Sequence, residues 1–164
     1  MTQIKTSTTI NAPIEIVFNN CRNIDIHQYS ASKTNEKAIA GRTSGLINKG
    51  ETVTWKGKHF GIHLKHQSII SEMEFPNYFA DEQLKGQFKS FKHQHFFTQK
   101  ENQTIMTDIL DYETPFGFIG KLFDKLLLVN HLTNFIIYRN AILKELSENH
   151  QHQPPQNRNT FYPK

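Results

Sequence analysis

Four side chains in this sequence could transfer protons or hold a polar group: Glu51, His93, His95 and Asp108. An imidazole changes its charge near neutral pH, and a carboxylate beside it can orient it or accept its proton. His93 and His95 are separated by one residue, so in a β-strand both side chains point to the same face. The chemistry therefore depends on whether these residues lie in strands and on which face of each strand is buried.

Aromatic bulk predicts the buried face of each strand. Successive side chains of a strand alternate between two faces, and the alternating set with the larger apolar and aromatic surface is expected to face the core. The inner sets are then Glu51, Val53 and Trp55; Phe91, His93, His95 and Phe97; and Met106, Asp108, Leu110 and Tyr112. This choice places two acids and two histidines inside an apolar shell.

The buried polar set has four interpretations. It could be a satisfied polar network that stabilises the sheet (or a set that faces solvent, if the opposite face of the strand is the inner one), a cluster that binds the polar end of an apolar ligand, a His–carboxylate pair for general acid–base catalysis, or a metal site. We predict no metal and no cofactor, because a His-x-His spacing alone is common, and we assign no catalytic residue. The predicted ligand-binding residues are Glu51, Trp55, Phe91, His93, His95, Phe97, Met106 and Asp108.

Nearby carboxylates should control the titration of the two histidines. Burial lowers the pKa of a histidine, whereas a carboxylate within reach raises it, and the charge pair is expected to be the stronger effect. We therefore predict coupled titration and a raised pKa for at least one of His93 and His95. Three further histidines, His59, His63 and His66, lie near a predicted turn and are expected at the surface. Cys21 is expected to be a small core residue without a base beside it.

The elements that would position these residues follow from periodicity and capping. A Thr-rich strand from Ile4 to Ile10 precedes two short helices, the first capped by Asn11 and the second, from Ile24 to Tyr29, capped by Asn23. Glycines and Pro76 then punctuate a series of strands at 51–58, 62–73, 78–84, 88–99 and 104–112. Short links between consecutive strands predict an antiparallel meander.

The stretch from Thr114 to Glu148 is predicted to be one long closing helix. Its apolar residues recur at helical spacing, but the apolar stripe of the first half points away from that of the second half. A straight helix on a flat sheet would not show this drift. We therefore expect a helix that bends, or one with two buried faces, held by a curved sheet.

Four local motifs and the order of elements resemble a known superfamily. The motifs are Gly50-Glu51-Thr52-Val53-Thr54-Trp55, Gly86-Gln87-Phe88, His93-Gln94-His95-Phe96, and Thr104-Ile105-Met106-Thr107-Asp108 followed by Pro115-Phe116-Gly117. Over roughly Ile4 to Leu146, the chain resembles the helix-grip (SRPBCC) superfamily of START-type lipid carriers, birch-pollen-allergen-like proteins and polyketide-cyclase-like proteins, in particular a bacterial subgroup. The resemblance implies an α+β fold, with a seven-stranded curved antiparallel sheet around the long C-terminal helix and a cavity between them. It transfers fold more firmly than function.

Composition limits the classes of function. The 164 residues fit one domain, 1–148, followed by a polar stretch, 149–164, that is expected to be disordered. A single cysteine excludes an internal disulfide, no apolar run is long enough for a membrane span, and no signal-peptide pattern opens the chain, so we expect a cytoplasmic protein. The net charge of +4 comes without a dense basic block, which argues against nucleic-acid binding. Sequence signatures of hydrolases, NTPases and dehydrogenases are missing.

We therefore expect a carrier or sensor of a hydrophobic small molecule. The alternative is a cyclase, dehydratase or isomerase that acts on a polyketide-like or aromatic substrate through the internal His/carboxylate cluster. A protein partner is also possible, since the resemblance includes cell-division-like labels and the long helix has a second apolar face.

Overall fold

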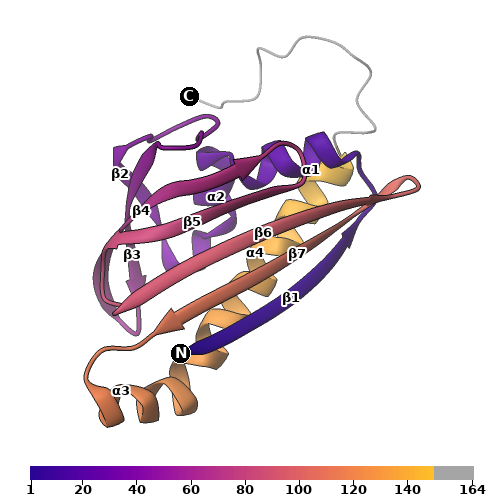
Figure 1. The fold of residues 1–164 in the computed structure, drawn as a ribbon. Helices are drawn as coiled ribbons and strands as arrows, with labels where there is room; N and C mark the ends of the chain where they lie inside the picture. The colour runs from indigo at the N-terminus through magenta and orange to yellow at the C-terminus, as the bar shows by residue number, and fades with distance from the viewer. Residues whose placement is uncertain (150–164) are drawn as a thin grey trace.

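The structure is a computed structural model, described for residues 1–149. A curved antiparallel sheet and a long helix make up most of it (Figure 1). The expected polar tail, apart from its first residue, lies outside the described residues. The strands are β1 (Thr2–Ile10), β2 (Lys37–Gly41), β3 (Thr52–His59), β4 (Ile62–Glu74), β5 (Tyr78–Lys85), β6 (Ser90–Lys100) and β7 (Gln103–Glu113). The helices are α1 (Ile14–Cys21), α2 (Ile24–Ser30), the 3₁₀ turn η1 (Ser32–Thr34), α3 (Gly117–Phe123), the π-helical turn η2 (Asp124–Leu128) and α4 (Val129–Asn149).

The strands form one seven-stranded sheet in the order β1-β7-β6-β5-β4-β3-β2, and every neighbouring pair is antiparallel. Helices α1 and α2 connect the edge strands β1 and β2 at one end of the sheet, and α4 crosses the concave side, where it contacts β1, α1 and α2 (Figure 1). This arrangement confirms the predicted fold: a curved seven-stranded antiparallel sheet, a long C-terminal helix, and two short helices after the first strand.

Strand alternation positions the predicted polar residues. In the antiparallel register, His95 of β6 lies opposite Asp108 of β7, and Phe97 lies opposite Met106. All four side chains are buried, as are Leu110 and Tyr112 of the same β7 set. The choice of inner face in β6 and β7 is therefore confirmed.

The closing helical region is not one α-helix. The π-helical turn η2 separates α3 from α4, and Asp124 at its start accepts hydrogen bonds from the hydroxyls of Tyr112 and Thr2. A π-helical turn adds a residue to the turn and rotates every later side chain around the axis. Most apolar residues before and within this turn, among them Leu122, Leu126 and Leu127, are exposed, whereas Leu132, Ile136 and Leu143 of α4 are buried. The two apolar stripes therefore do not share one buried face. No helix within residues 1–149 is both long and apolar enough to cross a membrane.

The start of α1 also differs from the prediction. Pro13, not Asn11, occupies the N-cap position, and no side chain of the cap residue bonds to the helix. Instead, the side-chain oxygen of Gln99 accepts the hydrogen bond from the Ile14 N–H at 2.9 Å, so a strand residue satisfies this helix end. The second cap is as predicted, because the Asn23 side chain accepts from two backbone N–H groups of α2.

Candidate functional site

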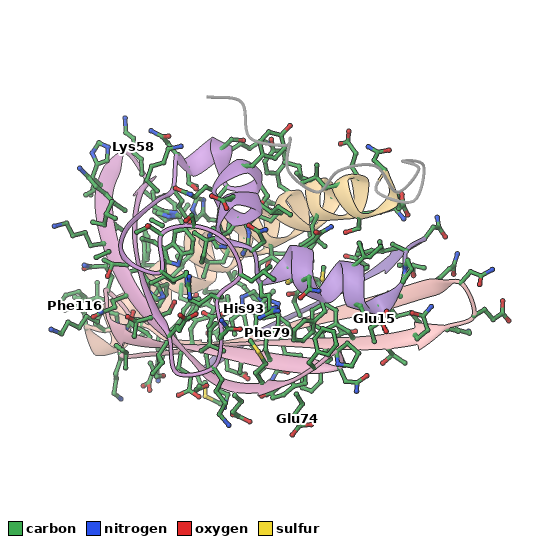
Figure 2. The ribbon with its side chains drawn as sticks, turned by 90° about the horizontal axis from the view of Figure 1, so that it is seen from above. Glu15, Lys58, Glu74, Phe79, His93 and Phe116 are labelled. Carbon is green, nitrogen blue, oxygen red and sulfur yellow. The ribbon has the colours of Figure 1, made fainter. Side chains whose placement is uncertain are left out.

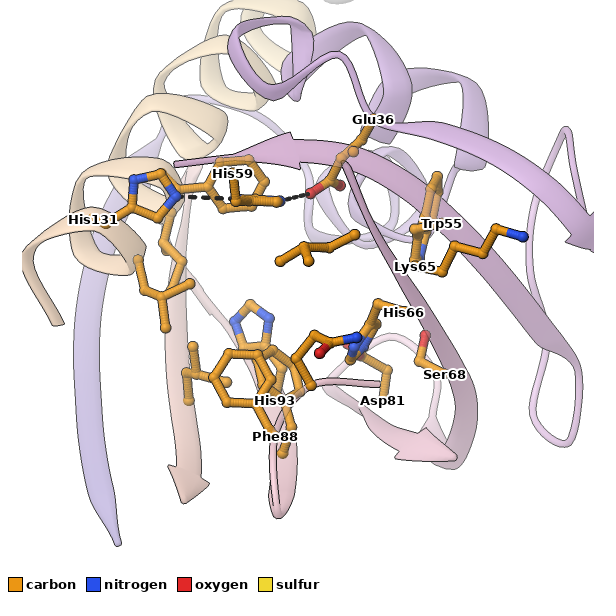
Figure 3. Close-up of a pocket in the computed structure, with 18 of the residues that line it drawn as sticks. Glu36, Trp55, His59, Lys65, His66, Ser68, Asp81, Phe88, His93 and His131 are labelled. Atoms are coloured by element: carbon orange, nitrogen blue, oxygen red, sulfur yellow. Dashed lines mark hydrogen bonds and ion pairs between the residues drawn. The ribbon is translucent and has the colours of Figure 1, made fainter. Parts of the chain in front are cut away.

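A cavity of about 700 Å³ lies between the sheet and α4 (Figure 3). This volume falls within the about 300 to 1,000 Å³ that small-molecule sites usually occupy. Apolar side chains from the strands, the β5–β6 link and α4 form most of its wall, among them Val53, Trp55, Ile70, Phe79, Phe88, Leu110, Leu132 and Ile136. Two groups of titratable side chains interrupt this wall, one centred on β5, β6 and β7 and the other across the cavity, on α2, the segment before β2, β3 and α4.

The sheet cluster consists of Asp81, His93, His95, Asp108 and Asn140. Asp108 is its buried centre: its Oδ1 lies 2.7 Å from His95 Nδ1 and 3.2 Å from His93 Nε2, and its Oδ2 accepts from Asn140 Nδ2 at 2.6 Å. The other ring nitrogen of His95, Nε2, lies 3.4 Å from Asp81 Oδ1. The strands place the acids on either side of His95, and α4 supplies the amide that holds Asp108.

The two adjacent histidines of this cluster have opposite pKa shifts. Burial opposes a charge on His95, but Cys21, Asp108 and Asp81 together raise the pKa of His95 well above its usual value. Burial and the charge of His95 lower the pKa of His93, and Asp108 offsets only part of this effect. Burial alone would raise the pKa of Asp108, but His93 and His95 hold it well below the usual value. The raised pKa of His95 agrees with the sequence prediction.

We expect an NMR titration of the imidazole protons to show two well-separated transitions. The midpoint for His93 should lie below the usual histidine pKa of about 6.5, and the midpoint for His95 above it. The stabilising contribution of His95 is complete below that unfolded-state value and is lost as pH rises through its folded pKa. His93, whose folded pKa is lowered, contributes above about pH 6.5 and loses its contribution as pH falls through its folded pKa. Asp108→Asn should bring the His95 transition down. Two transitions that stay near the unshifted value would contradict this assignment.

The opposite cluster consists of His27, Glu36, His59 and His131, of which Glu36, His59 and His131 are labelled in Figure 3. Glu36 is buried and lies 2.7 Å from His27 Nε2 and 3.3 Å from His59 Nε2, while His59 Nδ1 lies 3.0 Å from His131 Nε2. Gly57 leaves room for this acid, because a Cβ at that position would lie 2.7 Å from Glu36 Cγ. A hydrogen-bonded chain thus runs from Glu36, two residues after η1, through β3 to α4 along one side of the cavity.

Charge in this cluster is concentrated on Glu36. Burial would raise the pKa of Glu36, but hydrogen bonds from His27 and His59 hold it well below its usual value. Burial lowers the pKa of His27, and burial together with His59 lowers the pKa of His131. Both clusters of the cavity therefore contain carboxylates whose pKa values are lowered by neighbouring histidines.

The structure brings together seven of the eight predicted ligand-binding residues, but it separates Glu51. Trp55, Phe91, His93 and His95 line the cavity directly, while Phe97, Met106 and Asp108 are buried beside it. The expectation that Glu51 points inward is wrong. Glu51 precedes β3, and its carboxylate bonds to Arg42 and to the N–H of Asn48 at the surface. The strand alternation does not extend to a residue in the preceding loop.

Several residues that line the cavity were not predicted from the sequence to do so. His59 and His66 were expected at the surface, yet both line the cavity, whereas His63 is exposed. Asp81 and Glu36 were not singled out. Cys21 is buried as predicted, but the expectation that no base lies near it is wrong, since His95 Nδ1 lies 3.7 Å from its Sγ.

Comparisons with known proteins bear on the fold. No protein-family model and no curated protein matches the chain. A crystal structure of a Thermus thermophilus protein is similar with a TM-score of 0.74 and 15% identity, over 93% of this chain and 100% of that one. A START superfamily protein from Mycobacterium smegmatis is similar with a TM-score of 0.67 and 11% identity, over 90% of this chain and 97% of that one. The chain has a START-like helix-grip fold.

A plant protein shares the same START-like fold. Ginseng major latex-like protein 151 from Panax ginseng has a TM-score of 0.66 and 12% identity, over 89% of this chain and 97% of that one. Since each of these identities is low, the comparisons support the arrangement of sheet and helix that the sequence predicted. Any function has to be argued from the cavity itself.

Proposed function

We propose that the protein is a carrier or sensor that holds a hydrophobic small molecule between the sheet and α4. The observation that carries this proposal is the cavity of about 700 Å³, whose wall is mostly apolar and whose polar groups converge in two clusters. A well-packed core leaves few voids larger than a water molecule, so a space of this size is available to a ligand.

The cavity mouth supports access from outside. Phe60, Ile62, Phe116, Ile119 and Phe123 line the cavity and are also exposed. Phe116 lies at one end of the molecule, whereas Phe79 and His93 lie in its interior (Figure 2). A ligand with an apolar body could enter between the β3–β4 turn and α3 without crossing a polar surface.

The interior offers hydrogen-bond donors to a polar end of the ligand. Within residues 1–149, Arg139 Nε and His93 Nε2 are buried side-chain atoms without a hydrogen-bond partner, and both residues line the cavity. A buried donor without a partner is unfavourable, and an oxygen atom of a ligand would satisfy it. We therefore infer an amphipathic ligand whose oxygen-bearing end lies near Arg139 and His93.

The experiment is equilibrium binding with anilinonaphthalene sulfonate, which has an aromatic body and one anionic group, combined with native mass spectrometry of protein purified from its host. We expect one probe per chain, a blue-shifted fluorescence and competition by the co-purified molecule. If the purified protein carries no ligand from its host and binds no probe, the carrier function is excluded.

A second candidate is an isomerase, dehydratase or cyclase, and one observation favours it. The rings of His93 and His95 lie 4.0 Å apart, and their pKa values are shifted in opposite directions. A neutral imidazole beside a charged one provides a base and an acid at a single site. If the ligand from the host is converted by wild type but not by His93→Gln, the enzyme is supported. If the ligand from the host is bound but never converted, the carrier function is supported instead.

A further inference from the structure

The sheet cluster contains a set of side chains that suits a metal ion. Asp81, His93 and His95 each offer one ligand atom, and these three atoms all lie within 4.8 Å of one another. The β5–β6 register explains this placement, because Asp81 lies directly opposite His93 and diagonally across from His95. The set combines two neutral-capable imidazoles with one carboxylate, a donor combination found in zinc and non-haem iron sites.

The spacing of the first pair already fits a tetrahedral ion. Bonds of about 2.0 to 2.1 Å around zinc place neighbouring ligand atoms about 3.3 Å apart. His95 Nε2 and Asp81 Oδ1 lie 3.4 Å apart, a long distance for a hydrogen bond but a suitable one for two ligands of one ion. Rotation of the His93 ring would bring the third atom into place.

His93 supplies an independent observation. Its side chain is nearly completely buried, and its Nε2 has no hydrogen-bond partner, although Asp108 Oδ1 lies 3.2 Å away without hydrogen-bond geometry. The ring lines the cavity, and the close-up shows it directed into the open space (Figure 3). In the tautomer with the proton on Nδ1, this nitrogen would bind an ion through its lone pair, and the hydrogen bond from Nε2 to a ligand oxygen inferred above then belongs to the metal-free protein.

A second layer of contacts fixes His95. Asp108 lies 2.7 Å from His95 Nδ1 and is itself held by Asn140 at 2.6 Å. A metal-binding histidine typically donates its other ring N–H to a carboxylate in this way, which fixes the tautomer and turns the second nitrogen toward the ion. Here that second nitrogen is Nε2, on the side of Asp81.

We propose that Asp81, His93 and His95 bind one divalent transition-metal ion, of which Zn²⁺ is the simplest probe, on the wall of the cavity. Three protein ligands leave at least one coordination position open toward the cavity, where a water molecule or an oxygen of a bound molecule would complete the shell. The site does not depend on the proposed apolar ligand, since all three residues and the Asp108–Asn140 support belong to the protein itself.

The test is calorimetric titration of the full chain with Zn²⁺, repeated with Co²⁺ for its visible absorption spectrum. His150 and His152 are replaced by Gln in every sample, so that histidines near the end of the chain do not contribute. We expect one ion per chain, release of protons on binding, and a Co²⁺ spectrum of low coordination number with nitrogen and oxygen ligands.

Matched variants decide the assignment. Asp81→Asn and His93→Gln should each weaken Zn²⁺ binding by at least about tenfold, because each removes one of three protein ligands. His63→Gln, which changes an exposed histidine on β4, should leave the affinity unchanged. Circular dichroism checks that each variant is folded, and Asp81→Asn, at a partly exposed position, provides the test if His93→Gln does not fold. Unchanged affinity in Asp81→Asn, or an equal loss in His63→Gln, would overturn the proposal.

Discussion

Asp108→Ala should lower the free energy of unfolding by about 3 to 5 kcal/mol, the usual cost of removing one partner from a buried ion pair. Asp108 is almost completely buried, and its carboxylate meets His93, His95 and Asn140. The alanine would leave an amide and two imidazoles in the interior without their shared partner. Urea denaturation at neutral pH, followed by circular dichroism, measures the change.

The matched control is Asp111→Ala on the same strand. Asp111 lies on the outer face of β7, partly exposed, and its carboxylate accepts from Gln3 at 2.9 Å and Gln94 at 3.5 Å. Loss of these contacts should cost about 1 kcal/mol or less. Similar losses in the two variants would show that the sheet cluster contributes no more than surface hydrogen bonds.

The pH dependence separates charge from packing at Asp108. Its pKa is held well below the usual value, so its contribution is present above about pH 3.9 and is lost as pH falls through the folded value. Asp108→Asn keeps the size of the side chain and an oxygen for Asn140, but it removes the charge that faces the two histidines. The difference between the Asn and Ala variants therefore reports the packing and hydrogen-bond part, and the difference between wild type and Asn reports the charge.

Strand alternation was enough to predict much of the site. Aromatic bulk selected the inner faces of β6 and β7, and the structure buries His93, His95 and Asp108 as a result. The same rule could have found more. The Trp55 set of β3 continues to His59, the Phe79 set of β5 continues to Asp81, and both residues line the cavity.

The rest of the site depends on contacts between distant segments. Glu36 follows a 3₁₀ turn and reaches the cavity only because β3 has a glycine, Gly57, beside it. His131 near the start of α4 meets His59 at the end of β3 across a separation of 72 residues, which no local pattern encodes. The drift between the two apolar stripes was visible in the sequence, but the π-helical turn at Asp124 and the exposure of most of the first stripe were not.

The two clusters place charge at opposite walls of an apolar space. The carboxylates of both clusters, Glu36 on one side and Asp81 and Asp108 on the other, have lowered pKa values because histidines lie beside them. Among the cavity-lining residues that the structure describes, Arg139 Nε and His93 Nε2 are the buried side-chain atoms without a hydrogen-bond partner. This arrangement favours an anionic or oxygen-bearing ligand end and disfavours a cationic one, which would find its acceptors occupied.

Filling the cavity should remove ligand binding without loss of stability. Ser68 of β4 is buried and lines the cavity, so the ring in Ser68→Phe would enter space that the proposed ligand needs. We expect the Kd of anilinonaphthalene sulfonate to rise at least about tenfold, equivalent to about 1.4 kcal/mol of binding free energy. Because the new ring meets open space instead of packed atoms, the free energy of unfolding should stay the same or increase.

Gln67→Phe is the control, since it adds the same group one residue away on the outer face of β4. Gln67 is partly exposed and pairs with Thr54 of β3, on the side of the sheet opposite the cavity. The affinity of the Gln67→Phe variant for the probe should remain that of wild type. The control also tests whether the probe binds to the exposed apolar residues of α3, because such binding would persist in both variants. Equal affinity in Ser68→Phe, Gln67→Phe and wild type would mean that the probe binds outside the cavity, and it would remove the support that probe binding gives to a carrier.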